Sequence, residues 1–253
     1  MRKMIVITPA FCKAELLDLS LQQYYKYQRG NYEHWILLNH YPVKKAENNT
    51  RIIEIAKKYN CKLFDSGQDW GLHTSTNRFL HSIGWPDGMM AIAYDPDSAI
   101  EGMSYGFDVA LAETLDEGIG QGIAILGLWG IGIDLKYREN KNFQKVFIKN
   151  NAVLLHPSIE MWSVSITDLD FIKAVGGFQQ TNKYYGGVEI ALYRNFKLHQ
   201  KRLAYLTEYK ELYFNYPVET IDPEYQQWKH DHLHGFTESF EKWLEINKPE
   251  LLK

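Results

Sequence analysis

Short apolar runs alternate with helix-like stretches along the first 115 residues of this chain. Four of the runs have the length and composition of buried strands, at residues 4–8, 34–38, 61–64 and 89–94. Between them lie stretches with helical spacing of apolar side chains, at residues 15–27, 49–59 and 73–83. This order predicts an α/β fold with a Rossmann-like, mostly parallel central sheet flanked by helices.

Polar or turn-forming residues follow each predicted strand. In chain order they are Thr8-Pro9, Asn39-His40, Asp65-Ser66 and Asp95. Because the carboxyl ends of parallel strands meet at one edge of the sheet, we expect these residues to lie near one another. Open α/β sheets bind their ligands at this edge, so the candidate site is expected there.

The second part of the chain is less regular. We expect helices over residues 98–115, 168–175, 188–197 and 237–246, and strands over residues 123–128, 153–155 and 161–166. Thr167 is the expected N-cap of the helix that begins at Asp168. No linker rich in proline, glycine or serine interrupts the chain, so residues 1–253 are expected to form a single domain.

Composition excludes several classes of function. Net charge is −3 and the sequence contains no basic stripe, which argues against a nucleic-acid partner. Cys12 and Cys61 lie far apart and lack metal-ligand spacing, as expected of a protein from a reducing compartment. No apolar run is long enough for a signal peptide or a transmembrane segment. We therefore expect a cytoplasmic protein, with peripheral attachment to a membrane as an alternative.

Two carboxylates, Asp95 and Asp97, follow the strand predicted at residues 89–94. Pro96 disfavours the helical conformation at Asp95, so the backbone is expected to stay extended. Carboxylate oxygens suit hard cations such as Mg²⁺ or Mn²⁺. The same residues also fit a plain Asp-Pro turn, and their local context does not separate the two interpretations. A second Asp-x-Asp, at residues 168–170, fits the acidic first turn of a helix instead.

Four further motifs occur in a fixed order around this acidic pair. They are Thr8-Pro9-Ala10-Phe11, then Asp69-Trp70-Gly71 with Ser75-Thr76-Asn77, then Gly176-Gly177-Phe178, and last Gly187-Val188-Glu189. In this order and spacing the chain resembles the GT-A fold glycosyltransferases, and most nearly glycosyltransferase family 2, over about residues 4–195. The resemblance implies a nucleotide-binding half at residues 1–115. Residues 116–253 would then form an acceptor-side half with a C-terminal helical tail.

The resemblance implies a donor site for a nucleotide-diphosphate sugar, with UDP as the expected nucleotide. The residues that would hold the donor are Thr8, Pro9, Ala10, Phe11, Asn39, Asp69, Asn77, Arg78 and Asp95. Two of them depart from the family pattern. Asn39 stands where the family usually has an acidic pair, and Asp69 replaces an asparagine. The departure at Asn39 leaves the identity of the nucleotide open.

The resemblance also implies a metal site that holds Mn²⁺ or Mg²⁺. Asp95 and Asp97 would bind the ion, and a histidine from the segment at residues 230–234 would add a further ligand. The candidates are His232 and His234, which share one face of an extended segment with His230. An independent zinc site and a solvated loop are alternative interpretations of these histidines.

Glu189 occupies the place of the family's catalytic base, although Val188 replaces the acidic residue that usually precedes it. A stabilising role in the first turn of a helix is the alternative for Glu189. The acceptor, a glycan or glycolipid, would contact Trp162, Gly177, Phe178 and Tyr185. Aromatic faces of this kind stack on sugars, and they also serve ordinary packing.

The implied activity is metal-dependent transfer of a sugar to an acceptor hydroxyl, with inversion. Sugar nucleotidyltransferases share the sheet layout, but they carry a glycine-rich basic segment where this chain has Ala10-Phe11-Cys12-Lys13. A degenerate, non-catalytic sugar- or nucleotide-binding module is the second alternative. The departures at Asn39 and Val188 favour that module, whereas the presence of both Asp95 and Asp97 argues against it.

Overall fold

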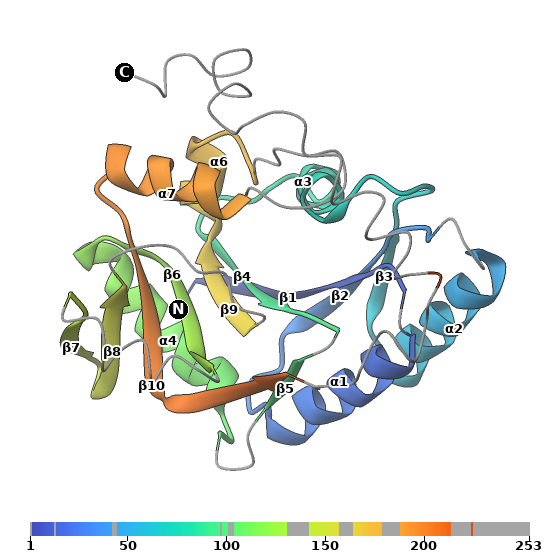
Figure 1. Cartoon of the computed structure of the whole chain (residues 1–253), viewed down its shortest axis with the longest axis horizontal. Coiled ribbons are helices and arrows are strands. Elements are labelled where there is room, and N and C mark those ends of the chain that lie inside the picture. The colour runs from blue at the N-terminus through green and yellow to red at the C-terminus, as the bar shows by residue number, and fades with distance from the viewer. Residues whose placement is uncertain are drawn as a thin grey trace.

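The computed structural model describes residues 2–12, 14–41, 45–96, 98–100, 104–130, 142–156, 164–178 and 188–213, together with Glu224. This part of the chain forms one large sheet with helices on both faces (Figure 1). One face carries α3 (Leu72–Ser82), α6 (Leu169–Ala174) and α7 (Val188–Leu198). The other carries α1 (Ala14–Tyr27), α2 (Lys45–Lys58) and α4 (Phe107–Gly118), with a short 3₁₀ helix, η1 (Ile119–Gln121), after α4.

Ten strands pair within the described residues, in the order β3-β2-β1-β4-β9-β6-β10-β8-β7, and β5 pairs with β10 outside this path. The first five are β1 (Lys3–Ala10), β2 (Glu33–Leu38), β3 (Lys62–Asp65), β4 (Met89–Tyr94) and β5 (Ser98–Ile100). The others are β6 (Ile123–Gly130), β7 (Gln144–Ile148), β8 (Asn151–His156), β9 (Val164–Asp168) and β10 (Arg202–Tyr213).

Pairing in the sheet changes from parallel to antiparallel beside β4. Strands β3, β2, β1 and β4 pair in parallel, as the sequence predicts. Strand β9 lies between β4 and β6 and is antiparallel to both. Strand β10 is parallel to β6 and antiparallel to β8. The strand that ends in Asp95 is therefore the last of the parallel set.

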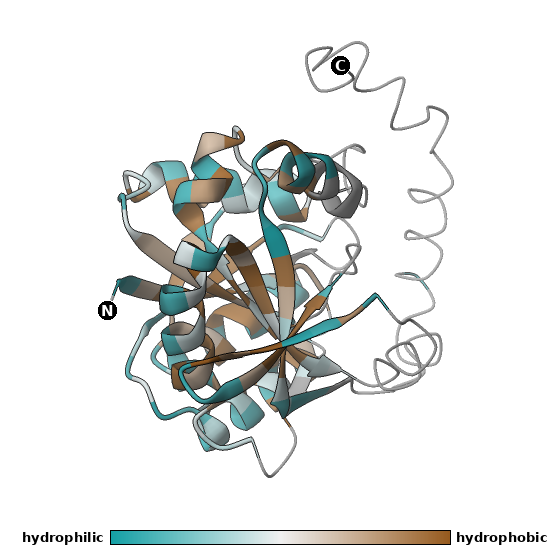
Figure 2. Cartoon of the chain, turned by 90° about the vertical axis from the view of Figure 1, so that its left-hand side faces the viewer, coloured by the Kyte–Doolittle hydropathy of each residue, from teal (hydrophilic) through white to brown (hydrophobic). Residues whose placement is uncertain are grey.

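Strands β1, β4 and β6 are apolar along nearly all of their length because both faces of the sheet are covered there. Ile5 and Ile7 pack in the core beneath α3, whereas Met4 and Val6 pack in the core beneath α4. This alternation follows from the two-residue period of side chains along a strand. Figure 2 shows the result, with apolar segments concentrated on the strands inside the molecule and polar ones on the outer surfaces of the helices.

The predicted helix over residues 98–115 is wrong in its first part. Residues Ser98–Ile100 form β5, and α4 begins only at Phe107, after Gly106 with a φ of 80°. Strand β5 pairs with the end of β10, and this distant partner overrides the local helical pattern.

Two smaller expectations at element ends are also wrong. The N-cap of α6 is Asp168, whose carboxylate accepts a hydrogen bond from the N–H of Asp170, because Thr167 is still part of β9. Pro9 continues β1 instead of forming a turn. It pairs with Leu37 of β2, and the ladder with β4 has already ended at Ile7, so the missing proline N–H is tolerated there.

Strands β7 and β10 are not predicted from the sequence. Strand β10 pairs with β6 and β8 along its first part and with β5 at its end. Its register against β6 shifts between Leu206 and Lys210, where the strand departs from regular pairing. The helix predicted at residues 237–246 lies outside the described residues.

Candidate functional site

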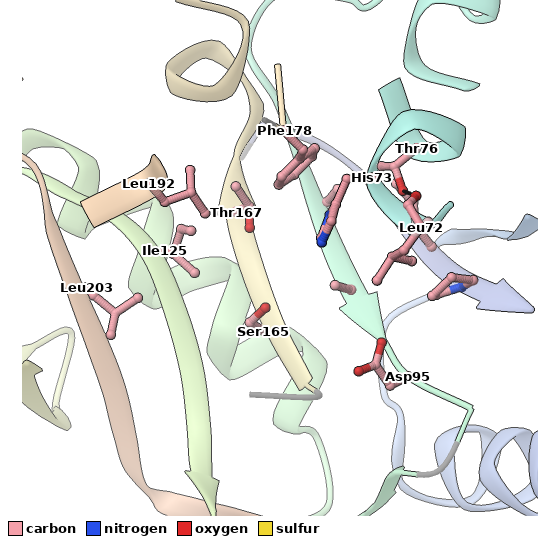
Figure 3. Close-up of a pocket in the computed structure, with 14 residues that line it drawn as sticks. Leu72, His73, Thr76, Asp95, Ile125, Ser165, Thr167, Phe178, Leu192 and Leu203 are labelled. Carbon is pink, nitrogen blue, oxygen red and sulfur yellow. Dashed lines mark hydrogen bonds between the residues drawn. The ribbon is translucent and has the colours of Figure 1, made fainter. Parts of the chain in front are cut away.

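A cavity of about 100 Å³ lies between the sheet and the helices of the α3–α7 face (Figure 3). Strands β1, β4, β9, β6 and β10 form its wall on the sheet side, and α3, α7 and Phe178 close the opposite side. Most of its lining is apolar. The polar side chains among the described lining residues are His73, Thr76, Asp95, Ser165 and Thr167. An apolar cavity with a few placed polar groups is the usual composition of a small-molecule site.

Asp95 lies at the end of β4, on the wall of this cavity. Its backbone carbonyl accepts hydrogen bonds from the Ser20 hydroxyl (3.0 Å) and from the Ser98 N–H (3.1 Å), which fix the end of the strand. The residue is half-buried. One of the two predicted acidic residues is thus at the carboxyl edge of the parallel strands.

The segment from Thr8 to Ala10, predicted to hold the nucleotide, does not present one face. Pro9 lines the cavity. Thr8 is fully buried, and its hydroxyl lies 2.9 Å from Nε2 of His34. Ala10 packs in the core formed with α1 and α2. Because side chains alternate along β1, Thr8 and Ala10 in this arrangement can contact a ligand only through their backbone.

Asn39 and Phe11 lie where β1, β2 and β3 end. The Asn39 N–H donates to the Ala10 carbonyl (2.8 Å), and its side-chain oxygen accepts from the Ser66 hydroxyl (3.3 Å). The ring of Phe11 packs edge-on against Tyr41, with centroids 5.1 Å apart. The strand ends that the sequence places together are therefore in contact.

The turn before α3 is closed by Asp69. Its carboxylate accepts a hydrogen bond from the Gly71 N–H (2.9 Å), and Gly71 has a φ of 73°, which a residue with a side chain rarely adopts. Arg78 of α3 is exposed, and its guanidinium carbon lies 4.2 Å from the centroid of the Trp70 ring. Arg78 is thus held at the surface by a cation–π contact.

The side-chain amide of Asn77 holds the backbone of Phe178. Its nitrogen donates to the Phe178 carbonyl (2.9 Å), and its oxygen accepts from the Phe178 N–H (2.9 Å). Gly177 has a φ of 99°, and a Cβ at this position would lie 2.9 Å from the Asn77 oxygen. These contacts join α3 to the segment after α6. The amide that the resemblance assigns to the donor is used here by Phe178.

Three polar residues of the cavity were not predicted from the sequence. His73 lies in the first turn of α3, with its ring centroid 6.1 Å from that of Phe178, and burial lowers its pKa to about 4. Ser165 and Thr167 occupy alternate positions on β9 and face the same side of the sheet. The spacing of His73 to Asn77, one turn of helix, is the signal that points to His73.

Several predicted residues lie outside the described part of the chain. They are Asp97, Trp162, Tyr185, His232 and His234. Glu189 lies in the first turn of α7, where the structure describes its backbone only. Within the described residues no group of three or more His, Cys, Asp or Glu side chains forms a metal site. The carboxylate of Asp95 has the chemistry that Mn²⁺ and Mg²⁺ prefer, and it is the described part of the expected ligand set.

Comparison with known proteins shows the fold. No family model and no curated protein matches the sequence. A mannosyltransferase from Pyrobaculum calidifontis, solved with GDP-Man and Mn²⁺, matches 92% of this chain with a TM-score of 0.59 and 13% identity. TarS of S. aureus, solved with UDP-GlcNAc, matches 96% of the chain with a TM-score of 0.54 and 15% identity.

The chain has the GT-A glycosyltransferase fold. Glucosyl-3-phosphoglycerate synthase from Mycobacterium tuberculosis, solved with Mn²⁺, UDP and phosphoglyceric acid, also matches it, at a TM-score of 0.54 and 13% identity over 87% of this chain and 73% of that one. This GT-A chain spans 62% and 64% of the lengths of the first two structures. In the GT-A fold of this chain, Asp95 directly follows β4, the strand at which the parallel block β3-β2-β1-β4 meets the antiparallel β9.

None of the helices in the described part of the GT-A chain is long and apolar enough to cross a membrane.

Proposed function

We propose that this protein is a glycosyltransferase that moves a sugar from a nucleotide-diphosphate donor to an acceptor hydroxyl. The observation that carries the proposal is the position of Asp95. It lies at the carboxyl end of β4, on the wall of a cavity, where the sheet changes from parallel to antiparallel pairing. Ligands of α/β sheets bind at such a point. The fold, shared with enzymes solved with GDP-Man, UDP-GlcNAc or UDP, supports the same class of donor.

In this proposal the donor, expected to be UDP-linked, lies along the ends of β1, β2 and β3. Pro9 and Phe11 contact the base and ribose, and Thr8, Ala10 and Asn39, which are at most 2% exposed, contribute backbone groups only. Asp69 shapes the turn that leads into α3. Arg78, exposed on the same helix, provides a positive charge for the phosphates.

Mn²⁺ or Mg²⁺ would be bound by Asp95 and Asp97, with His232 or His234 as a further ligand. Such an ion neutralises the charge that develops on the departing nucleoside diphosphate. Asp95 is suited to this role because its backbone is fixed by Ser20 and Ser98 while the residue keeps part of its surface exposed. Asn77 supports the site indirectly, because it holds Phe178 at the cavity wall.

Glu189 is the proposed base. Position 189 precedes Leu192 by almost one turn of α7, and Leu192 lines the cavity. Glu189 would take the proton from the acceptor hydroxyl, whose oxygen then bonds to the anomeric carbon as the bond to the diphosphate breaks. Attack from the side opposite the leaving group inverts the configuration. The acceptor, a glycan or glycolipid, would contact Trp162, Gly177, Phe178 and Tyr185.

Calorimetric titration of UDP with and without Mn²⁺ tests the donor and the metal together. We expect Mn²⁺ to tighten UDP binding by at least about tenfold in the parent, and this gain to be lost in Asp95→Asn, because each close charge-assisted contact contributes about 1.5–3 kcal/mol. Asp87→Asn is the matched control. Asp87 pairs with Lys173 at 2.7 Å and does not line the cavity, so this variant should behave as the parent does. An affinity of the parent for UDP that is the same with and without Mn²⁺ contradicts the proposal.

A second experiment addresses the base. Glu189→Gln keeps the size and hydrogen-bonding capacity of the side chain but removes its basicity. We expect UDP binding to be kept and sugar transfer to fall by about a hundredfold or more. Transfer at the parent rate would show that Glu189 is not the base.

A further inference from the structure

Two hydroxyl groups in the cavity wall have no hydrogen-bond partner among the described residues. Ser165 and Thr167 are 8% and 5% exposed, and both line the cavity. Within the part of the chain that the structure describes, neither side-chain oxygen makes a hydrogen bond, whereas the hydroxyl of Thr76, on the opposite wall, donates to the Leu72 carbonyl (2.9 Å). Neither oxygen is among the fully enclosed, unpaired polar atoms of the described residues, so both are open to the cavity, and a polar group inside it is the partner that they can take.

The two hydroxyls are placed to act together. Ser165 and Thr167 are two positions apart on β9, so they lie on one face of the sheet, roughly 6–7 Å apart along the strand. Figure 3 shows both side chains on β9, and His73 on α3 lines the same cavity. Their neighbours on β4 are small, with Ala93 opposite Ser165 and Ala91 opposite Thr167. The small side chains leave the space into which the hydroxyls project.

Size limits the group that fits. A cavity of roughly 150 Å³ holds a benzene ring, so the space here accommodates about four or five non-hydrogen atoms rather than a pyranose ring with its hydroxyls. This limit on the number of atoms follows from the volume of the cavity, which is about 100 Å³. A single hydroxyl substituent would leave most of the space empty and could not reach both oxygens. The cavity therefore suits a small branched substituent that carries a polar atom.

The charges of the residues that line the cavity further restrict which chemical group can bind in it. None of the described lining residues is a lysine or arginine. Burial lowers the pKa of His73 to about 4, so His73 is neutral near pH 7 and offers no positive charge. A carboxylate would be buried without a counter-ion, at a high cost in desolvation. A neutral substituent is favoured, and because a hydroxyl both donates and accepts, the polar atoms of the substituent can be acceptors or donors.

We propose that Ser165 and Thr167 bind the acylamino group of an N-acetylated donor sugar. The carbonyl oxygen of the group accepts a hydrogen bond from one hydroxyl, its N–H donates to the other, and its methyl group packs against Ala91 and Ile125. The inference rests on the proposed function, because Asp95 on the same wall is where the donor diphosphate is proposed to lie. The inference adds to the proposed function the chemical class of the donor sugar. Donors with a hydroxyl in place of the acylamino group leave Ser165 and Thr167 unpaired.

Calorimetry with matched donors tests the inference. The probes are UDP, UDP-N-acetylglucosamine, UDP-N-acetylgalactosamine, UDP-glucose and UDP-galactose, each with Mn²⁺. We expect the parent to bind an N-acetylated donor at least about tenfold more tightly than the corresponding hexose donor, as expected of two neutral hydrogen bonds. Thr167→Val and Ser165→Ala should each lose about three- to tenfold for the N-acetylated donor only. UDP itself should bind the parent and both variants equally.

Thr207→Val is the control for a strand threonine outside the cavity, since the Thr207 hydroxyl donates to the Ala152 carbonyl (3.1 Å). It should keep the parent's preference. Melting of the ligand-free proteins separates binding from folding. Thr167→Val removes a buried hydroxyl that lacks a partner among the described residues, so it should melt at or above the parent temperature. A lower melting temperature would show that the hydroxyl is structural, and Ser165→Ala would then have to carry the preference alone.

The outcomes separate the two levels of the proposal. If UDP binds with Mn²⁺ but N-acetylated and plain donors bind equally, the inference is overturned and the proposed function stands. The same holds if the preference survives in both variants. If neither UDP nor any of these donors binds with Mn²⁺, the proposed function fails, and the inference fails with it.

Discussion

The amide of Asn77 pairs with both backbone groups of Phe178, which follows it by 101 residues. One side chain thus satisfies a backbone donor and a backbone acceptor at once, and it does so between α3 and the segment after α6. Aspartate at this position would lose the donor, and glutamine would be one methylene too long. The contact fixes the position of Phe178 against a cavity whose other walls come from the sheet.

Removing the Asn77 amide should loosen this connection. Asn77→Ala deletes two hydrogen bonds and leaves two partly buried backbone groups unpaired, so we expect unfolding in urea to show a loss of about 2–3 kcal/mol. Asn77→Asp keeps one acceptor and should fall between the parent and Asn77→Ala. Arg78→Ala, the exposed neighbour, is the control and should cost less than about 1 kcal/mol. Equal losses for Asn77→Ala and Arg78→Ala would contradict the structural role of the amide.

Gly177 should tolerate no side chain, for two separable reasons. A methyl group there meets the Asn77 oxygen at 2.9 Å, and the φ of 99° is strained for any other residue. Gly84 has a similar φ of 79°, but no atom lies within 4 Å of the place that a Cβ would take, so Gly84→Ala measures the backbone strain alone. We expect about 1–2 kcal/mol for Gly84→Ala and at least about 1 kcal/mol more for Gly177→Ala in urea unfolding. Equal costs would show that contact with Asn77 is unimportant.

The parallel part of the fold is predictable because its signals are local. The run from Met89 to Tyr94 is apolar throughout, since both faces of β4 are covered, and Asp95-Pro96 ends it. Strand β10 lacks such a signal. Its second part mixes charged residues with tyrosines, and its partner changes from β6 to β5 along its length. Strand β5 is equally hard to predict from the sequence, because three residues are too few to show an apolar pattern and their pairing depends on β10.

The candidate site likewise contains residues that the sequence predicts and residues that only the structure shows. Asp95 is predictable because it directly follows a clear strand. The contact of Asn77 with Phe178 is not, because nothing in the sequence near either residue indicates a partner so far along the chain. Ser165 and Thr167 read as ordinary strand residues. Only the structure shows that their hydroxyls are buried and face a cavity.

Acid should destabilise the protein through His34. Burial lowers the pKa of His34 from 6.5 to about 3, so the unfolded chain binds a proton between these values that the folded protein does not. Stability therefore rises with pH across this window, by up to about 1.4 kcal/mol per pH unit for one group. His73, with a pKa near 4, adds to the same trend at the upper part of the window.

The test is urea unfolding of His34→Gln at pH 4, 5 and 6. Glutamine can still hydrogen-bond to the Thr8 hydroxyl, but it does not titrate, so the pH dependence should become shallower by up to about 1.4 kcal/mol per pH unit. His199→Gln, at an exposed position on the loop after α7, should leave the slope as it is. An unchanged slope in His34→Gln would mean that His34 does not cause the acid sensitivity.

Strand β10 has a consequence for how the protein is made. It is the last of the described strands to leave the ribosome, yet it lies between β6 and β8. Until Arg202–Tyr213 is synthesised, β6 and β8 each present an unpaired edge, and such edges pair readily with strands of other chains. The nascent protein thus passes through a stage in which two parts of its described sheet, six strands on the β6 side and two on the β8 side, are not yet joined. Association between neighbouring nascent chains is the hazard of that interval.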